Sequence, residues 1–349
     1  MTKSKTSTIF NIIGNGTRLY LQNIFILSAP VVMPVLGLFF GVALMILPVY
    51  LLPKFYPVWV ETVPFLKEFW VALSVIILSL LPGFVVFKIA FWNYMLKVVS
   101  LNVMVSDIIK RKVVKHHSQY TKIVALRTKD YLLMLLIWLL IILMGLALPV
   151  SVFLFNIEPV FVPYFLVGFE FLAVFLLIIL SIYLSLSFQV FAFETSFGPM
   201  QTLEQSFKLV LNNFWRIVTL MLALGIITAI VVPQIFVFIS DILMIKNTLA
   251  IPFQGVLKSV LNNYPNFYDA MNSFVAISYE SEQKFIFETS KLFSVSTISA
   301  LISLLMLPLG SCYYTLFYFD AQKRHEPKET PEKEEQESQK SKSKKSKKK

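Results

Sequence analysis

The stretch YLLMLLIWLLIILMGLALPVSVFLFN, residues 131–156, decides the fold because it is a long apolar run without a charged residue. A helix of about 20 residues crosses the hydrocarbon core of a bilayer, so this run is long enough to do so. Lipid cannot hydrogen-bond backbone amides, which excludes open strands and loops at that depth. Five other apolar stretches accompany it, at 24–53, 69–92, 160–193, 216–240 and 292–319. We therefore predict an all-α polytopic membrane bundle with six transmembrane helices.

The composition of the whole chain agrees with this fold class. Of its 349 residues, 57% are hydrophobic and 15% are charged, whereas about 25% of the residues in soluble domains are charged. No remaining segment is long and apolar enough to build a separate soluble core. The only cysteine, Cys312, lies inside the last apolar stretch, so it cannot form an intramolecular disulfide.

Lys and Arg fall mainly on one side of the predicted membrane. Because short cytoplasmic loops carry the excess positive charge, both termini are expected in the cytoplasm. The first apolar stretch is too long for a signal-peptide core, and we expect it to be retained. The predicted parts are a cytoplasmic amphipathic segment (1–23), a transmembrane domain (24–319) that contains an extracytoplasmic loop (241–291), and a disordered, charged cytoplasmic tail (320–349).

Short segments with apolar residues at helical spacing precede three of the predicted outgoing helices. They cover residues 9–23, 120–131 and 202–216, and each is expected to lie as an amphipathic helix in the cytoplasmic interface. In the third, Thr202 and Gln205 have the spacing of a capping box. The pattern has two explanations that the sequence leaves open, a threefold internal repeat or the shared composition of membrane segments.

Basic residues concentrate in the connection that contains the second amphipathic segment. We expect them to contact anionic lipid headgroups, which are the predicted partners of the protein. The candidate contacts are Lys110, Arg111, Lys112, Lys115, Lys122, Arg127 and Lys129. The lysines of the tail are not interleaved with aromatic residues, so no nucleic-acid partner is expected. Protein partners cannot be named from these residues.

Two segments, FQVFAFETSFGPMQTLEQSFKLVLNNFWR (188–216) and YTLFYFDAQKRHE (314–326), resemble a bacterial family of membrane proteins. That family is named after the membrane domain fused to some glycerophosphoryl diester phosphodiesterases, and it includes stand-alone relatives. In that family a helix ends in an acidic residue and is followed by an amphipathic helix that carries a serine and an aromatic residue. The last span ends in a tyrosine-rich stretch, which is followed by an aspartate and basic residues. The matching residues are Glu194, Ser206, Phe207, Trp215, Tyr318, Asp320, Lys323 and Arg324.

The resemblance implies a bacterial cytoplasmic membrane location and no catalytic residue, because the family's enzymatic activity belongs to a separate soluble domain. A direct search of the sequence agrees, since it has neither a phosphate-binding glycine loop nor a nucleophile elbow. His116, His117 and His325 are interpreted as solvated loop residues, because no carboxylate or cysteine cluster accompanies them. We expect no enzyme activity, cofactor or metal.

Glu170 is the one ionisable residue near the middle of a predicted span. Intramembrane carboxylates are costly and often functional, although a protonated Glu hydrogen-bonded to a neighbouring helix satisfies the same physics. Glu194, at the end of the same span, is expected to accept from nearby amides or to pair with Arg216. The sequence thus favours a non-enzymatic protein that organises lipids or partner proteins; the alternative is a small-solute transporter or channel that uses Glu170.

Overall fold

The computed structural model describes residues 8–62, 69–155, 162–263 and 281–325. Within these ranges only the backbone is described at 49–50, 52–62, 69–70, 72–73, 144–155, 162–171 and 325. The described residues are mostly helical and contain no strand. The chain divides into two compact units. Unit 1 comprises Met1–Gly16, Lys129–Val218 and Tyr313–Lys349, and unit 2 comprises Thr17–Thr128 and Thr219–Cys312.

The predicted all-α fold is confirmed, and the described residues contain five helical segments long and apolar enough to cross a membrane. These segments are Ile24–Pro48, Ser74–Ile109, Leu172–Phe193, Phe214–Ile242 and Glu282–Leu305. Many of their large side chains are exposed, as expected of surfaces that face lipid; Phe238, for example, is 67% exposed. The predicted span at 131–156 coincides with helix α5 (Thr128–Phe155), whose side chains are described only in part. The count of six spans therefore stays a prediction.

Unit 2 is built around α2 (Ile24–Thr62) and α3 (Phe69–Ile109), which pack along each other. Glycines allow the two backbones to approach closely. A Cβ atom on Gly41 would lie 2.7 Å from the Phe87 nitrogen, and one on Gly83 would lie 2.6 Å from the Met45 nitrogen. Gly37 and Gly41 form a G-x-x-x-G pattern, which lets helices pack tightly in lipid. In this chain the two glycines lie against Ala90 and Phe87, so the pattern allows α2 to pack closely on α3.

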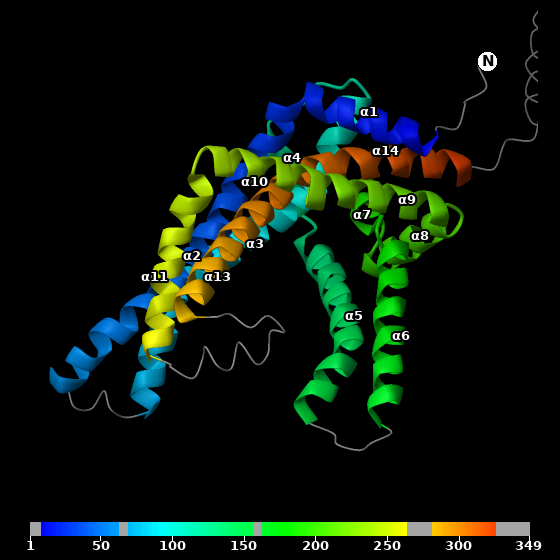
Figure 1. Ribbon diagram of the computed structural model, residues 1–349. Helices are drawn as coiled ribbons and strands as arrows, with labels where there is room; N and C mark the ends of the chain where they lie inside the picture. The colour runs from blue at the N-terminus through cyan, green and yellow to red at the C-terminus, as the bar shows by residue number, and fades with distance from the viewer. Residues whose placement is uncertain (1–7, 63–68, 156–161, 264–280, 326–349) are drawn as a thin grey trace, which may run out of the picture. The chain divides into compact units, whose positions relative to one another are not determined.

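Two more long helices of unit 2, α11 (Ile245–Asn263) and α13 (Glu282–Leu305), pack against each other and against α2 (Figure 1). The predicted extracytoplasmic loop, 241–291, is helical over much of its described part, and its location outside the membrane stays a prediction. It contains the end of α10 (Val232–Ile242), all of α11 and the beginning of α13. Buried Leu257, Leu261, Phe285 and Ile286 form one apolar cluster between α11 and α13, which explains why this part of the segment folds.

The predicted last span, 292–319, is also wrong, because the helix breaks at Met306. The apolar helix α13 begins ten residues earlier than predicted, and a second helix, α14 (Leu307–His325), follows the break. Pro308 accounts for this boundary, since a proline lacks the N–H that would bond to the carbonyl of Leu304. The predicted tail shortens at its start, because α14 continues through His325; residues 326–349 lie outside the described part.

Two of the carbonyls that prolines leave free in unit 2, those of Leu304 and Thr228, receive a side-chain hydroxyl. Tyr94 of α3 donates to the carbonyl oxygen of Leu304 at 3.3 Å. Residues Ile226–Val231 form a π-helix, in which each N–H bonds to the carbonyl five residues earlier. Pro233 follows this segment and has no N–H to donate to the carbonyl of Thr228. Ser303 of α13 donates to that oxygen at 3.1 Å. Such replacement partners matter in an apolar environment, where water cannot take their place.

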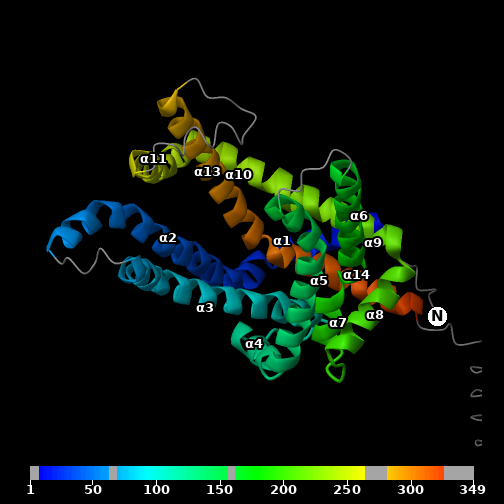
Figure 2. The same cartoon turned by 90° about the horizontal axis from the view of Figure 1, so that it is seen from below.

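Unit 1 contains α5, α6 (Val162–Tyr183), α7 (Ser187–Phe193) and α8 (Pro199–Leu211), with α5 and α6 side by side in Figures 1 and 2. The first residues of α9 (Phe214–Gly225), the second part of α14 and the start of α1 (Ile9–Gln22) complete it. The Tyr131 ring packs against that of Phe191 in a tilted arrangement, with ring centroids 5.5 Å apart. The Trp138 indole donates to Ser187 Oγ at 3.2 Å, which joins α5 to α7.

Helices occupy the three segments that were predicted to be amphipathic, but the capping box at Thr202 is wrong. Helix α8 begins at Pro199, and the Gln201 side chain accepts from the N–H of Gly198 at 3.0 Å. Thr202 is buried inside the helix, where its hydroxyl donates to the carbonyl of Gly198. A proline at the first helical position favours this earlier start.

The junctions that follow α1 and α8 have the same local geometry. At the first, the Asn23 side chain donates to the carbonyl of Leu19 at 2.9 Å. At the second, the Asn213 side chain donates to the carbonyl of Leu209 at 3.0 Å. Each asparagine thus bonds back across one helical turn, which satisfies a carbonyl at the end of the preceding helix. The threefold repeat stays a prediction, because Asn102 makes the same bond inside α3, to the carbonyl of Val98.

Candidate functional site

The connection between α3 and α4 (His117–Ala125) carries most of the predicted headgroup contacts, and it begins where α3 ends. Lys112 N–H donates to the carbonyl of Asp107 at 2.9 Å, and Arg111 N–H donates to that of Ile108 at 3.1 Å. These two bonds form a Schellman cap. Arg111 occupies its left-handed position with a φ of 53°, where glycine is favoured because a Cβ atom costs about 1 kcal/mol.

Helix α4 is fastened to α3 by a buried tyrosine. Tyr120 is 2% exposed, and its hydroxyl donates to Asp107 Oδ2 at 3.0 Å. The same hydroxyl accepts from the Lys115 N–H at 3.0 Å. Burial first, and then the Asp107 carboxylate, raise the pKa of Tyr120 above its ordinary value. The phenol therefore remains a hydrogen-bond donor at neutral pH and holds the connection against the end of α3.

A second fastening point joins Lys97 of α3 to Thr121 of α4. Lys97 is 9% exposed, and its Nζ donates to Thr121 Oγ1 at 2.7 Å. Thr121 Oγ1 in turn donates to the carbonyl of His117 at 3.1 Å. Partial burial, followed by the charges of Lys97 and His116, lowers the pKa of His117. A buried cation, a hydroxyl and a neutral imidazole thus lie around the first turn of α4.

The basic residues predicted to contact headgroups lie around this pair of helices. Lys110, Arg111, Lys112, Lys115 and Lys122 are exposed, and Arg127 is half-buried. The structure places these six in unit 2, whereas Lys129 belongs to unit 1. No Asp or Glu occurs between residues 108 and 129, so the positive charges of the connection are not offset by acidic neighbours in the sequence.

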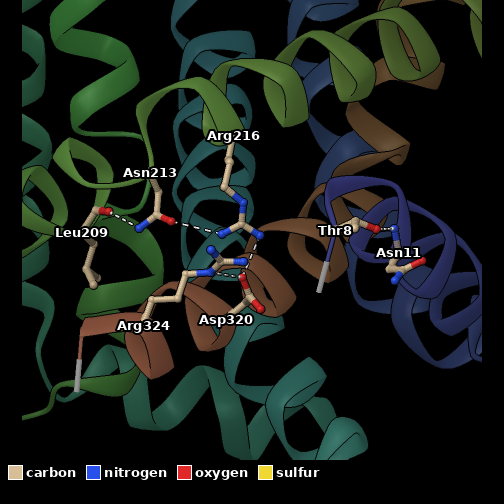
Figure 3. A network of polar contacts seen from close by, with 7 residues as sticks. All are labelled: Thr8, Asn11, Leu209, Asn213, Arg216, Asp320 and Arg324. Atoms are coloured by element: carbon tan, nitrogen blue, oxygen red, sulfur yellow. Dashed lines mark hydrogen bonds and ion pairs between the residues drawn. The ribbon is translucent and has the colours of Figure 1, made fainter. Parts of the chain in front are cut away.

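A different polar network lies in unit 1, where α8 gives way to α9 beside α14 (Figure 3). Arg216 Nη2 donates to Asp320 Oδ2 at 2.8 Å, and Arg324 Nε donates to the same oxygen at 3.0 Å. Arg216 Nη1 also donates to Asn213 Oδ1 at 3.1 Å. The guanidinium of Arg216 stands 5.5 Å from the ring centroid of Phe317. These contacts hold the start of α9 against the second half of α14.

Two alternatives were predicted for Glu194, hydrogen bonds from nearby backbone amides or a pair with Arg216, and the hydrogen bonds described for its side chain come from neither. Glu194 Oε1 instead accepts from the Tyr318 hydroxyl at 3.0 Å and from Gln322 Nε2 at 3.4 Å. Arg216 is engaged with Asp320, which lies two residues, or about half a helical turn, from each partner of Glu194 on α14. Helix spacing therefore assigns the two acids to different partners. The two segments of the family resemblance, 188–216 and 314–326, make direct contacts in this network.

Glu170 and the two adjacent histidines are the other residues singled out in the sequence. Glu170 lies in α6, where only the backbone is described, so its functional role stays a prediction. His116 caps α4, since its Nδ1 accepts from the Ser118 N–H at 3.5 Å. His117 is half-buried rather than solvated. Among the residues that the structure describes, no three His, Cys, Asp or Glu side chains gather into a group suited to a metal ion.

The chain was compared with family models, curated proteins and solved structures, and no match was found in any of them. The resemblance to the phosphodiesterase-associated membrane family therefore rests on the residues quoted for it.

In the sequence, Lys97 was counted only among the positive charges that indicate the cytoplasmic side, and its burial was not predicted. A usable signal was its position, five residues after Trp92 and one turn after Tyr94, just past the predicted end of a span. Sequence reasoning also missed the ion pair between Arg216 and Asp320, for which the sequence offers no signal because 104 residues separate the partners. The G-x-x-x-G pattern at Gly37 and Gly41 was visible in the sequence and would have indicated close packing of α2.

Proposed function

We propose that the protein is a multi-pass protein of the bacterial cytoplasmic membrane that holds anionic lipid headgroups at the connection between α3 and α4. By holding them it organises the surrounding lipids or partner proteins. Support comes from the apolar segments and from the basic residues around α4. Each Lys or Arg near an anionic surface contributes about 1 kcal/mol of attraction, so the six in unit 2 act together as a substantial electrostatic anchor.

The length of α3 supports this placement at the interface. The helix has 41 residues, which is about 60 Å at 1.5 Å per residue and roughly twice the thickness of the hydrocarbon core. Its last turns and α4 therefore extend past the apolar region, where Lys and Arg side chains can reach phosphates. With the chain oriented by the excess of positive charge, this end faces the cytoplasm.

The observation that carries the proposal is the left-handed Arg111 at the end of α3. Glycine would cap the helix at lower conformational cost. A strained residue points to a role beyond the cap itself, and the exposed guanidinium of Arg111 lies among the lysines of the connection. Arginine binds phosphate oxygens in a bidentate manner, which fits a headgroup contact.

The test measures lipids retained by the purified full chain in nanodiscs of mixed neutral and anionic phospholipid. A variant with Lys110, Arg111, Lys112 and Lys115 changed to Gln should lose enrichment of the anionic lipid. The matched control changes Lys246, Lys258, Lys284 and Lys291, which lie on α11 and α13, and should keep it. Equal enrichment in wild type and the first variant overturns the proposal. Crosslinking in native membranes, followed by mass spectrometry, identifies protein partners in parallel.

A further inference from the structure

The position of Lys97 along α3 corresponds to the depth of lipid phosphates. The predicted span ends at residue 92, and Trp92 is of a residue type that concentrates at the membrane interface. Lys97 follows Trp92 by five residues, which is about 7 Å further along the helix. This distance carries its ammonium group from the edge of the hydrocarbon into the headgroup layer.

The charge of Lys97 is buried without an acidic partner. Its side chain is 9% exposed, and its ammonium donates one hydrogen bond, to Thr121 Oγ1. Among the residues that the structure describes, no carboxylate forms an ion pair with it. An ammonium has three N–H donors, and a buried charge is costly unless it is paired. The position therefore favours an anion that the described residues do not supply.

The nearest acid on the same helix does not fill that role. Asp107 follows Lys97 by ten residues, about 15 Å along the helix axis, and its Oδ2 accepts from the Tyr120 hydroxyl. Around Lys97 the described polar groups are the Thr121 hydroxyl and the His117 imidazole, both half-buried. Helix α4 packs on α3 here (Figure 2), so the partly exposed side of the cluster is the start of α4, which carries Thr121 and His117.

We propose that Lys97, Thr121 and His117 form a binding site for a single phosphate group. Lys97 supplies the positive charge and its two remaining donors, and Thr121 fixes the position of the ammonium. The imidazole of His117 lies at the rim and adds a further donor. The phosphate comes from an anionic phospholipid headgroup or from free phosphate in solution. The site deepens the proposed function and rests on it, because it identifies one specific contact within the general attraction of the basic connection.

The experiment compares wild type with Lys97→Met and Lys97→Arg, each as the full chain in nanodiscs of phosphatidylcholine and phosphatidic acid. Native mass spectrometry counts the phosphatidic acid molecules that remain bound. Lys97→Met should weaken retention about tenfold, as expected when one charge-assisted hydrogen bond is lost, whereas Lys97→Arg should retain it. The control Lys258→Met removes an exposed lysine from α11 and should bind like wild type. Thermal unfolding verifies that each variant is folded.

The two sources of phosphate are separated by repeating the measurement in neutral nanodiscs with inorganic phosphate. Saturable binding of inorganic phosphate that Lys97→Met abolishes assigns the site to free phosphate; retention of phosphatidic acid alone assigns it to lipid. If Lys97→Met retains as much of both ligands as wild type, the phosphate site is refuted. The proposed function then still stands when the variant of Lys110, Arg111, Lys112 and Lys115 loses anionic lipid, and it fails separately when that variant does not.

Discussion

Arg216 at the start of α9 and Asp320 in α14 form an ion pair, with Nη2 and Oδ2 2.8 Å apart, although 104 residues separate them. Asp320 is 12% exposed and accepts from Arg324 through the same oxygen. One carboxylate therefore pairs with two guanidinium groups at this point in unit 1. Because both arginines depend on it, Asp320 is the residue whose loss disturbs the network most.

Replacing Asp320 with Asn should destabilise unit 1 by about 1–3 kcal/mol, since it leaves two partly buried cations facing each other. Denaturant unfolding of the full chain in detergent measures the free energy, and hydrogen exchange of α14 locates the change. Glu204→Gln is the control, because Glu204 and Lys208 are 63% and 58% exposed and such surface pairs contribute little. Equal effects of the two substitutions would contradict this reading of the network.

Ser303→Ala and Tyr94→Phe should each cost about 1 kcal/mol of stability, because each removes the donor of a carbonyl that a proline leaves free. Ser296→Ala, at an exposed position on the same helix as Ser303, is the control and should be neutral. A double-mutant cycle gives the sharper test. In a Pro308→Ala background the backbone can satisfy the carbonyl of Leu304, so Tyr94→Phe should cost less there. An unchanged cost would refute the proposed role of Tyr94.

Arg111→Gly should separate stability from lipid binding. Glycine relieves the left-handed conformation and should stabilise the end of α3 by about 1 kcal/mol, while the loss of the guanidinium weakens binding to anionic vesicles. Lys112→Gly removes the same charge from a residue without a positive φ, so it should weaken binding without the gain in stability. Vesicle co-sedimentation and thermal unfolding report the two quantities. If Arg111→Gly binds anionic vesicles as wild type does, Arg111 is not a headgroup contact.

The packing of α4 on α3 should weaken as the pH falls below about 6.5. The pKa of His117 is lowered in the folded protein by burial and by Lys97 and His116, relative to about 6.5 for an unperturbed histidine. Above that pH the imidazole is neutral in both states and packing is at full strength. As the pH falls toward the lowered pKa, the undocked state takes up the proton first, which favours it.

Hydrogen exchange of α4, corrected for the intrinsic effect of pH on exchange, measures this change. His117→Gln should abolish the pH dependence, and Lys97→Met should reduce it because one charge that lowers the pKa is removed. A pH dependence that persists in His117→Gln would assign the titration to another group.

Much of the fold could be predicted because apolar length and helical spacing are local properties. The predicted helices at 9–23 and 69–92 correspond to α1 and to the first part of α3. Element boundaries failed where a single residue outweighed the pattern. Pro308 divides the apolar stretch that was predicted to be a single span. Pro199 begins α8 three residues before Thr202, where a capping box was predicted.

The candidate site was predictable only in part. The sequence located the basic connection, since charge counts need no coordinates. It could not show that Lys97 is buried beneath α4, because burial depends on how α4 folds back onto α3. For Glu194 it left open a choice between nearby amides and Arg216. In the structure Glu194 accepts from Tyr318 and Arg216 pairs with Asp320, because these two residues of α14 lie on different faces of the helix.

The sequence by itself determined that this chain is helical and built from apolar segments. Lipid offers no hydrogen-bond partners, so the backbone of an apolar segment must form its hydrogen bonds within the helix. The sequence also determined where positive charge concentrates along the chain. Only the tertiary structure decided which polar side chains meet, such as Lys97 with Thr121 and Arg216 with Asp320. The physical reason is that side chains engage within about 3 Å, so their pairing depends on how helices distant in sequence pack and in which register.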